Sequence, residues 1–134
     1  MINKSILFLL GFAMLLTTKC SNNEIAFNGT PEGTFDALVA SIKARDLDAY
    51  ATCWYTGTAE REGMISRIKE DPKLWDELNA MFKGKLTLVA GRTYEIEEGT
   101  IKKFEVKAPE VPKGDGIGGI SMIKVGEIWK MYHW

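Results

Sequence analysis

Few residues in this sequence of 134 could carry out chemistry, and His133 is its single histidine. The closing segment IWKMYHW alternates like a strand, so His133 is expected to share one face with Trp129 and Met131. If that face lines a pocket, His133 lies at its rim and could act as a general base. The alternative is a surface histidine whose sequence context fixes no partner carboxylate. Because no nucleophile and base stand at a suitable spacing, we expect no catalytic residue.

Metal and cofactor sites are not expected either. The two cysteines, Cys20 and Cys53, and the single histidine are too few for a four-ligand zinc site. The glycine-rich stretch GDGIGG lacks the Gly-Lys-Ser/Thr ending of a phosphate-binding loop. It also joins two predicted strands and does not open a helix, so the helix N-terminus that binds phosphate is missing. The sequence therefore predicts a flexible loop here, no metal and no cofactor.

Aromatic residues give the best candidates for a pocket lining. The candidates gather in the segment AYATCWY, in one predicted helix and on the closing strand. They are Tyr50, Trp54, Tyr55, Trp75, Trp129 and His133. Aromatic side chains at helical spacing belong to a hydrophobic core more often than to a ligand site. The four candidates before residue 84 can therefore be core residues as well as pocket residues.

The N-terminus predicts export. A positively charged start, residues 1–4, precedes an apolar run over residues 6–16, which is the pattern of a signal peptide over residues 1–19. This run is shorter than the roughly 20 apolar residues of a membrane-spanning helix. Cys20 follows directly, and the polar segment 20–29 resembles the tether of a lipidated cysteine. We expect a membrane-anchored protein lipidated at Cys20.

One alternative to lipidation stays open. Lys19 stands where the residue before a lipidated cysteine is normally small, so the alternative is an ordinary signal peptide and a soluble periplasmic or secreted protein. In that case Cys20 keeps its thiol, and a disulfide to Cys53 becomes possible in an exported protein. If Cys20 is lipidated, Cys53 is a lone cysteine in an apolar stretch and behaves as a small buried hydrophobe.

Charge excludes one class of partner. Removing residues 1–19 takes away Lys4 and Lys19, which leaves 15 basic against 18 acidic residues and a net charge of −3. Lysines and arginines alternate with acids along the chain, so no basic patch suits nucleic acid. The remaining partners are the membrane through the lipid anchor, a small apolar ligand, another envelope protein, or a second copy of the chain through the sheet.

The periodicity of apolar residues predicts one α+β domain over residues 30–134. Residues 30–83 show helical spacing, with Thr30 and Pro31 opening the first helix. Residues 85–134 alternate as strands, and this places Leu88, Ala90, Tyr94 and Ile96 on one face. Because charged residues occupy the other face, the sheet is expected to be antiparallel. The predicted shared core comprises Phe35, Leu38, Ile42, Trp54, Leu78, Phe104, Val106 and Trp129.

Two segments carry a resemblance to a known family. The family is the NTF2-like (SnoaL-like, cystatin-like cone) superfamily. Its opening helix and the turn that follows resemble the segment TPEGTFDALVASIKARDLDAY, and its closing strand resembles the segment GEIWKMYHW. The sequence is most similar to its small bacterial lipoprotein branch typified by the domain of unknown function DUF4878. The resemblance covers residues 30–134 and implies helices packed into the concave side of a curved sheet, around a cone-shaped pocket.

Three classes of function follow. The first is a non-enzymatic envelope module that binds a small ligand or a protein. The second is a pocket enzyme of the isomerase, dehydratase or hydrolase type, for which the resemblance supplies no matching catalytic residue in this chain. The third is a structural envelope protein that dimerises through its sheet.

Overall fold

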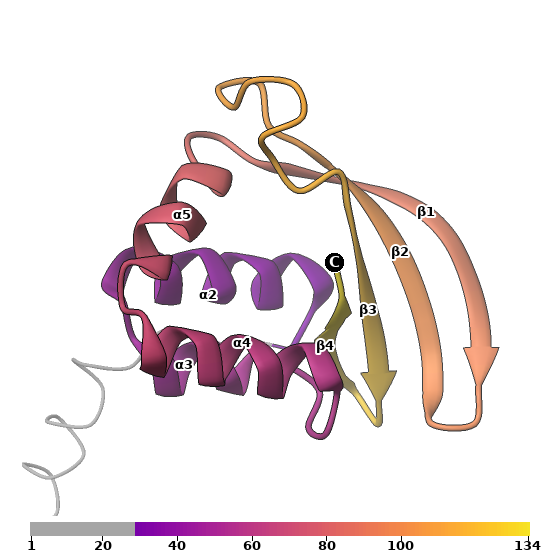
Figure 1. Cartoon of the computed structure of the whole chain (residues 1–134). Coiled ribbons are helices and arrows are strands. Elements are labelled where there is room, and N and C mark those ends of the chain that lie inside the picture. Colours follow the sequence, from indigo (N-terminus) through magenta and orange to yellow (C-terminus); the bar gives the residue numbers. More distant parts are fainter. Residues whose placement is uncertain (1–28) are drawn as a thin grey trace, which may run out of the picture.

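The computed structural model describes residues 29–134, in which four helices precede four strands (Figure 1). The helices are α2 (Pro31–Ala44), α3 (Leu47–Thr52), α4 (Ala59–Glu70) and α5 (Leu74–Met81). The predicted signal peptide and Cys20 lie outside the described residues. Among the helices of residues 29–134, none is long and apolar enough to cross a bilayer.

Polar side chains at the helix starts explain where α2, α3 and α4 begin. The hydroxyl of Thr30 accepts a hydrogen bond from the backbone N–H of Gly33 at 3.0 Å, and Pro31 follows in the first turn. The Asp46 carboxylate accepts from the N–H of Ala49 in the same way. Such caps satisfy backbone N–H groups that have no partner within the helix. The predicted start of α2 at Thr30–Pro31 is confirmed.

The strands form one antiparallel sheet in the order β1-β2-β3-β4. They are β1 (Thr87–Ile96), β2 (Gly99–Lys107), β3 (Gly119–Val125) and β4 (Ile128–His133). β1 and β2 bow, and the helices lie on the side toward which the sheet curves (Figure 1). The predicted α+β architecture, N-terminal helices packed on a curved antiparallel sheet, is confirmed.

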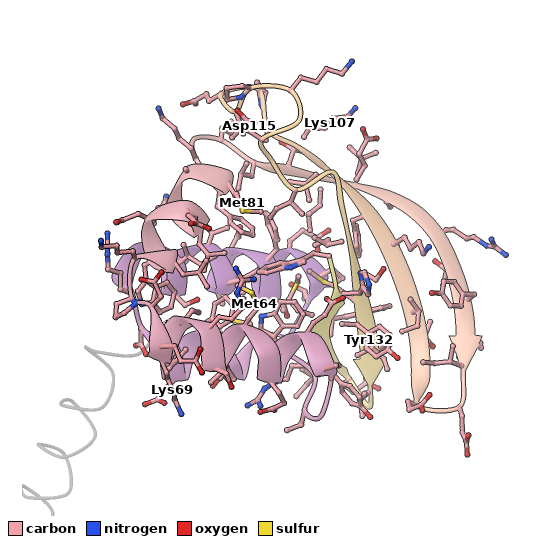
Figure 2. All side chains as sticks on the ribbon, viewed as in Figure 1. Met64, Lys69, Met81, Lys107, Asp115 and Tyr132 are labelled. Carbon is pink, nitrogen blue, oxygen red and sulfur yellow. The ribbon has the colours of Figure 1, made fainter. Side chains whose placement is uncertain are left out.

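The hydrophobic core fills the space between the helices and the sheet. Six of the eight predicted core residues are buried, while Val106 and Trp129 are half-buried and pack against the cluster. Figure 2 shows Met64 and Met81 pointing into this interior, whereas Lys69 points away from it. Burial of this common face holds the helical half to the strand half, because the apolar side chains of this cluster leave water where the two halves meet.

Two irregularities in the sheet change the predicted alternation. In β1 an extra residue lies between Ala90 and Thr93, so Ala90 pairs with Phe104 on the core face while Tyr94 pairs with Ile101 on the other face. A bulge of this kind reverses which residues point inward beyond it. The prediction that Tyr94 and Ile96 share a face with Ala90 is therefore wrong.

A second bulge lies in β4, where Met122 pairs with Met131 but Ser121 pairs with His133. The extra residue, Tyr132, turns His133 to the surface and returns Trp134 to the core, where its ring lies 5.9 Å from that of Phe82. Regular alternation along β4 predicts that His133 shares a face with Met131 and that Trp134 points to the opposite face. This prediction is wrong, because the bulge exchanges the two faces after Met131.

The segment after α3 covers the free edge of β4. The N–H of Met131 donates to the carbonyl of Cys53 at 2.8 Å, and the N–H of Tyr55 donates to the carbonyl of Met131 at 2.8 Å. Because neighbouring residues of an extended segment point to opposite sides, Trp54 enters the core while Tyr55 faces outward. This pairing removes an exposed sheet edge and fixes the position of Tyr55.

Candidate functional site

Two surface hollows adjoin Tyr55, and we call them the basic hollow and the acidic hollow. Both are lined by Tyr55 and Thr56. The Tyr55 ring lies 6.0 Å from the Tyr132 ring, centroid to centroid. Figure 2 shows Tyr132 beside the end of α4 that faces the sheet. The segment that covers β4, together with the start of α4, therefore shapes both hollows.

The basic hollow has a volume of about 370 Å³. Within residues 29–134, the charged residues that line it are two cations, Arg61 from α4 and Lys130 from β4. The pair Val125 and Ile128, which closes the β3–β4 hairpin, supplies apolar wall, and Tyr55 supplies an aromatic one. This volume is within the range of small-molecule sites, which combine apolar walls with a few polar groups.

Backbone carbonyls at the end of α3 hold the two cations in place. The Nε–H of Arg61 donates to the carbonyl of Ala51 at 3.3 Å, and the ammonium of Lys130 donates to the carbonyl of Thr52. Arg61 also forms an ion pair with Glu62, whose side chain is 59% exposed and does not line the hollow. Cations at a helix C-terminus satisfy carbonyls that lack partners within the helix.

Burial alters the titration of the groups beneath the basic hollow. The pKa of Lys130 is lowered, first by loss of water around the ammonium; nearby Cys53 opposes this and the positive charge of Arg61 adds to it. Burial also raises the pKa of the Cys53 thiol to about 11, and Lys130 partly offsets that rise. Two like charges are therefore held close together in a partly dehydrated place.

The acidic hollow, about 540 Å³ in volume, is also lined by Tyr55 and Thr56. Among the described residues, its charged lining residues are Glu60, from the first turn of α4, Glu98, from the β1–β2 turn, and His133. Tyr132 supplies an aromatic wall. Two carboxylates and one imidazole give this hollow a character opposite to that of its neighbour.

His133 and Glu60 form a pair within the acidic hollow. Nε2 of His133 lies 2.8 Å from Oε1 of Glu60, and the backbone N–H of Trp134 donates to Oε2 of the same carboxylate at 3.2 Å. The His133 side chain is 63% exposed and that of Glu60 31% exposed. Such a pair can orient an imidazole for proton transfer, but its water-exposed position is that of a surface ion pair.

Sequence reasoning missed Glu60, which it treated as solvated surface charge. The available signal was local: Glu60 stands two residues after Thr58, whose hydroxyl caps α4 by accepting from the N–H of Arg61 at 3.1 Å. An acid in the first turn is favoured by the helix dipole. That signal locates Glu60 on the helix, but its contact with His133 comes from the tertiary fold.

The other predicted pocket residues lie in different surroundings. Tyr50 and Trp75 are buried in an aromatic cluster, with ring centroids 5.9 Å apart in an edge-on arrangement. Trp54 is 2% exposed, stacks edge-on against Trp134 at 4.8 Å, and also reaches the lining of the basic hollow. Trp129 is half-buried and packs against the core. Only Tyr55 and His133 among the six are outward-facing residues of a hollow described above.

Two polar atoms in the aromatic cluster are buried without hydrogen-bond partners, Tyr50 Oη and Trp54 Nε1. Burial raises the pKa of the Tyr50 hydroxyl, and the nearby Trp54 indole N–H partly offsets this rise although the two atoms do not meet hydrogen-bond geometry. Neutral hydroxyl and indole groups can be buried at a cost of about 1–3 kcal/mol each, which a large aromatic core can absorb.

No protein-family model matches the sequence. No curated protein matches it. Among solved structures, a chain from Thiobacillus denitrificans described as a calcium/calmodulin-dependent protein kinase type II association domain is similar, with 17% sequence identity and a TM-score of 0.41. The match covers 81% of this chain and 94% of that chain.

Proposed function

We propose that this chain is an exported, membrane-tethered binding module whose folded domain holds a small molecule beside Tyr55. The observation that carries the binding role is the pair of hollows that share Tyr55 and Thr56 and together combine aromatic, apolar and charged walls. The start MINKSILFLLGFAMLLTTKC supports export and lipidation of Cys20. We further propose that the chain belongs with the small lipoproteins similar to DUF4878.

The binding role is tested on protein purified gently from its membrane. Native mass spectrometry should detect a bound small molecule, and Tyr55→Ala should release it, because that change removes a wall common to both hollows. Tyr94→Ala is the matched control, since Tyr94 is an exposed tyrosine on the sheet that lines neither hollow. Protein that carries no small molecule, or an equal loss in both variants, would contradict the binding role.

The tether is tested by fractionation. Wild-type protein should stay with membranes in high salt and leave them in detergent, because two or more acyl chains anchor stably while charge attraction is screened. Cys20→Ser should release the protein or leave its precursor uncleaved. Lys19→Ala should improve processing by placing a small residue before the cysteine. A soluble wild-type protein whose N-terminus is not Cys20 would overturn this part of the proposal.

A second candidate function is acid–base catalysis at the acidic hollow, favoured by the 2.8 Å contact between His133 and Glu60. Here Glu60 would orient the imidazole, whose other nitrogen would accept a proton. Hydrolysis of p-nitrophenyl acetate by the intact protein is a simple assay. Loss of activity in both His133→Ala and Glu60→Gln would support this candidate, and unchanged rates in both would remove it.

A further inference from the structure

The end of the β3–β4 hairpin leaves two aliphatic side chains in water. Val125 and Ile128 pair directly across the turn between the two strands, and they are 45% and 44% exposed. The other exposed large apolar side chains among residues 29–134 are Val89 and Tyr94, both on β1. Isolated apolar side chains are common on protein surfaces, but two cross-strand neighbours form one patch, and covering it is favourable.

The chain enters the domain beside this patch. The N–H of Trp129 donates to the carbonyl of Gly29 at 2.7 Å, and the Thr34 hydroxyl donates to the carbonyl of Trp129 at 2.6 Å. Gly29 also packs on Ile128, since a Cβ at this glycine would lie 3.4 Å from both Cγ atoms of the isoleucine. These contacts fix the first described residue at the start of β4. Figure 1 shows the turn of this hairpin at the end of the sheet opposite the loop between β2 and β3.

The sequence between Cys20 and the domain is short, because Cys20 precedes Gly29 by only nine residues. A chain of this length spans about 30 Å when fully extended, and about 15–18 Å on average as a random coil. A lipid-anchored Cys20 therefore keeps Gly29, and the aliphatic pair beside it, close to the bilayer surface. The loop between β2 and β3 lies at the other end of the sheet, farther from the point of attachment.

The surroundings of the aliphatic pair match a lipid surface. Tyr55, which lines the basic hollow together with Val125 and Ile128, is half-exposed. Tyrosine is enriched at the headgroup level of bilayers, because its ring is apolar while its hydroxyl prefers water. The turn itself carries the exposed Glu127, whose charge does not favour anionic lipid. A contact here is therefore held by apolar burial and not by charge attraction.

We propose that the end of the β3–β4 hairpin, Val125 and Ile128 with Tyr55 beside them, rests on the lipid bilayer to which Cys20 is anchored. This inference rests on the membrane tether proposed above, and it names the face of the domain that the tether brings to the lipid. The basic hollow, which these three residues line, then lies at the lipid surface, where an apolar ligand can reach it from the bilayer.

Fluorescence quenching tests the contact on the full lipidated chain, with one chain in each phosphatidylcholine nanodisc. Ile128→Cys carries the fluorophore NBD, while Cys53 is buried and the Cys20 thiol is blocked by its lipid. Phosphatidylcholine with a doxyl group on its acyl chain should quench this label at least about twofold, because groups that rest on a bilayer lie at the headgroup–acyl boundary. Val125→Cys gives the same test if the first variant does not fold.

Val89→Cys is the matched control. Val89 is an aliphatic residue of nearly equal exposure, 43%, and its row of the sheet runs through Glu105 to Gly119, at the end of β3 farthest from Val125. Its label should stay unquenched. Equal quenching at the two positions would mean that the domain tumbles freely at the surface, and absence of quenching at Ile128→Cys would mean that the hairpin stays in water. Either result would overturn the proposal.

The length of the tether and the salt concentration test the physical cause. Inserting about 20 Gly/Ser residues after Asn23 should lower the ratio of docked to undocked domain about sixfold, because the effective concentration falls as the −3/2 power of tether length. Quenching should persist in 1 M NaCl, since salt screens charge attraction and not apolar burial. Quenching that disappears in salt, or that ignores the longer tether, would contradict this cause and overturn the proposal.

The remaining outcomes identify other occupants and separate the two proposals. A label at Ile128→Cys that is shielded from water but unquenched by doxyl lipid would show that protein covers the hairpin, and shielding only with two chains in a disc would identify a second copy. Both results reject the bilayer. Intact-mass measurement showing an unmodified Cys20 would remove the tether and this inference together. A lipid-modified Cys20 with an unquenched label would reject this inference and leave the tether standing.

Discussion

The two hollows beside Tyr55 differ in how their charges are balanced. In the acidic hollow, the carboxylate of Glu60 already faces His133 at 2.8 Å and the N–H of Trp134 at 3.2 Å. In the basic hollow, Arg61 donates to the carbonyl of Ala51 and pairs with the exposed Glu62, and Lys130 donates to the carbonyl of Thr52. The acidic hollow therefore brings a carboxylate and an imidazole into contact, whereas the basic hollow brings two cations to backbone carbonyls at the end of α3.

One short segment creates this contrast. Pairing with β4 fixes residues 53–55, so Trp54 is buried in the core and reaches the lining of the basic hollow, while Tyr55 lines both hollows. Arg61 and Glu60 then follow on adjacent positions of the first turn of α4 and diverge, one to each hollow. Neighbouring helix residues point about 100° apart, so one turn can supply a side chain to each of the two hollows.

The largest expected effect comes from removing the buried aromatic side chain that reaches the lining of the basic hollow. Trp54→Ala should lower the free energy of unfolding by about 3–5 kcal/mol, because it deletes a buried aromatic side chain packed on Tyr50 and Trp134. Urea unfolding followed by circular dichroism measures this. Tyr55→Ala is the control and should cost clearly less, since its ring is half-exposed. Equal losses in the two variants would mean that the pairing of residues 53–55 with β4, and not the packing of Trp54 in the core, accounts for the loss of stability.

The second prediction concerns alkaline pH, because burial shifts the pKa values of Cys53, Tyr50 and Lys130. The Cys53 pKa rises from 9.0 to about 11 on folding, so above pH 9 the unfolded chain releases this proton first. Stability should therefore fall between pH 9 and 11, by at most about 2–3 kcal/mol from this group. Tyr50, whose pKa is also raised from 10.0, adds to the loss above pH 10.

As the pH rises, the Lys130 ammonium changes the free energy of unfolding in the opposite direction to the Cys53 thiol. The contributions of these two groups can therefore be separated. Its pKa is lowered from 10.5, so on raising the pH the folded state releases this proton first and gains stability relative to the unfolded one. Urea unfolding at half-unit steps from pH 8 to 11 should therefore show a flatter decline in Cys53→Ala and a steeper one in Lys130→Gln. A decline that is unchanged in Cys53→Ala would contradict the buried-thiol explanation.

The fold could be predicted from the sequence because its determinants are local. The spacing of Phe35, Leu38 and Ile42, and the cap at Thr30, define α2 without reference to the rest of the chain. The change of period after Gly84 likewise marks the start of the sheet. The two bulges could not be predicted, because the residues around Gly91 and Tyr132 alternate as regular strands do and only the partner strand reveals the extra residue.

The site was less predictable than the fold. Tyr55 and His133 were recognised as candidates from residue type alone, yet their partners, Glu60, Arg61 and Lys130, carry ordinary surface charges in the sequence. Their contacts join residues far apart in the sequence, such as Lys130 and the carbonyl of Thr52, which are 78 residues apart. These contacts depend on how α3 and α4 are placed against β4, which no pattern of period 2 or 3.6 encodes. The predicted homodimer through the sheet stays a prediction.

The smallest expected effect concerns the pair His133–Glu60 in the acidic hollow, which we expect to behave as an ordinary surface ion pair. His133→Ala should lower the free energy of unfolding by no more than about 1 kcal/mol at pH 6, because both side chains contact water and the pair is screened by salt. Glu60→Ala should cost somewhat more, since it also removes the acceptor for the N–H of Trp134.

A double-mutant cycle on His133→Ala and Glu60→Ala measures the coupling between the two side chains, with urea unfolding in 0.05 M and 1 M NaCl. We expect a coupling below about 1 kcal/mol that shrinks in high salt, as exposed pairs show. The same cycle on the exposed pair Glu105 and Lys107, which are 2.8 Å apart on β2, provides the reference. A His133–Glu60 coupling well above that reference and insensitive to salt would mean that the pair is shielded from water. That result would remove the contrast between the hollows and move the acid–base enzyme ahead of the binding module.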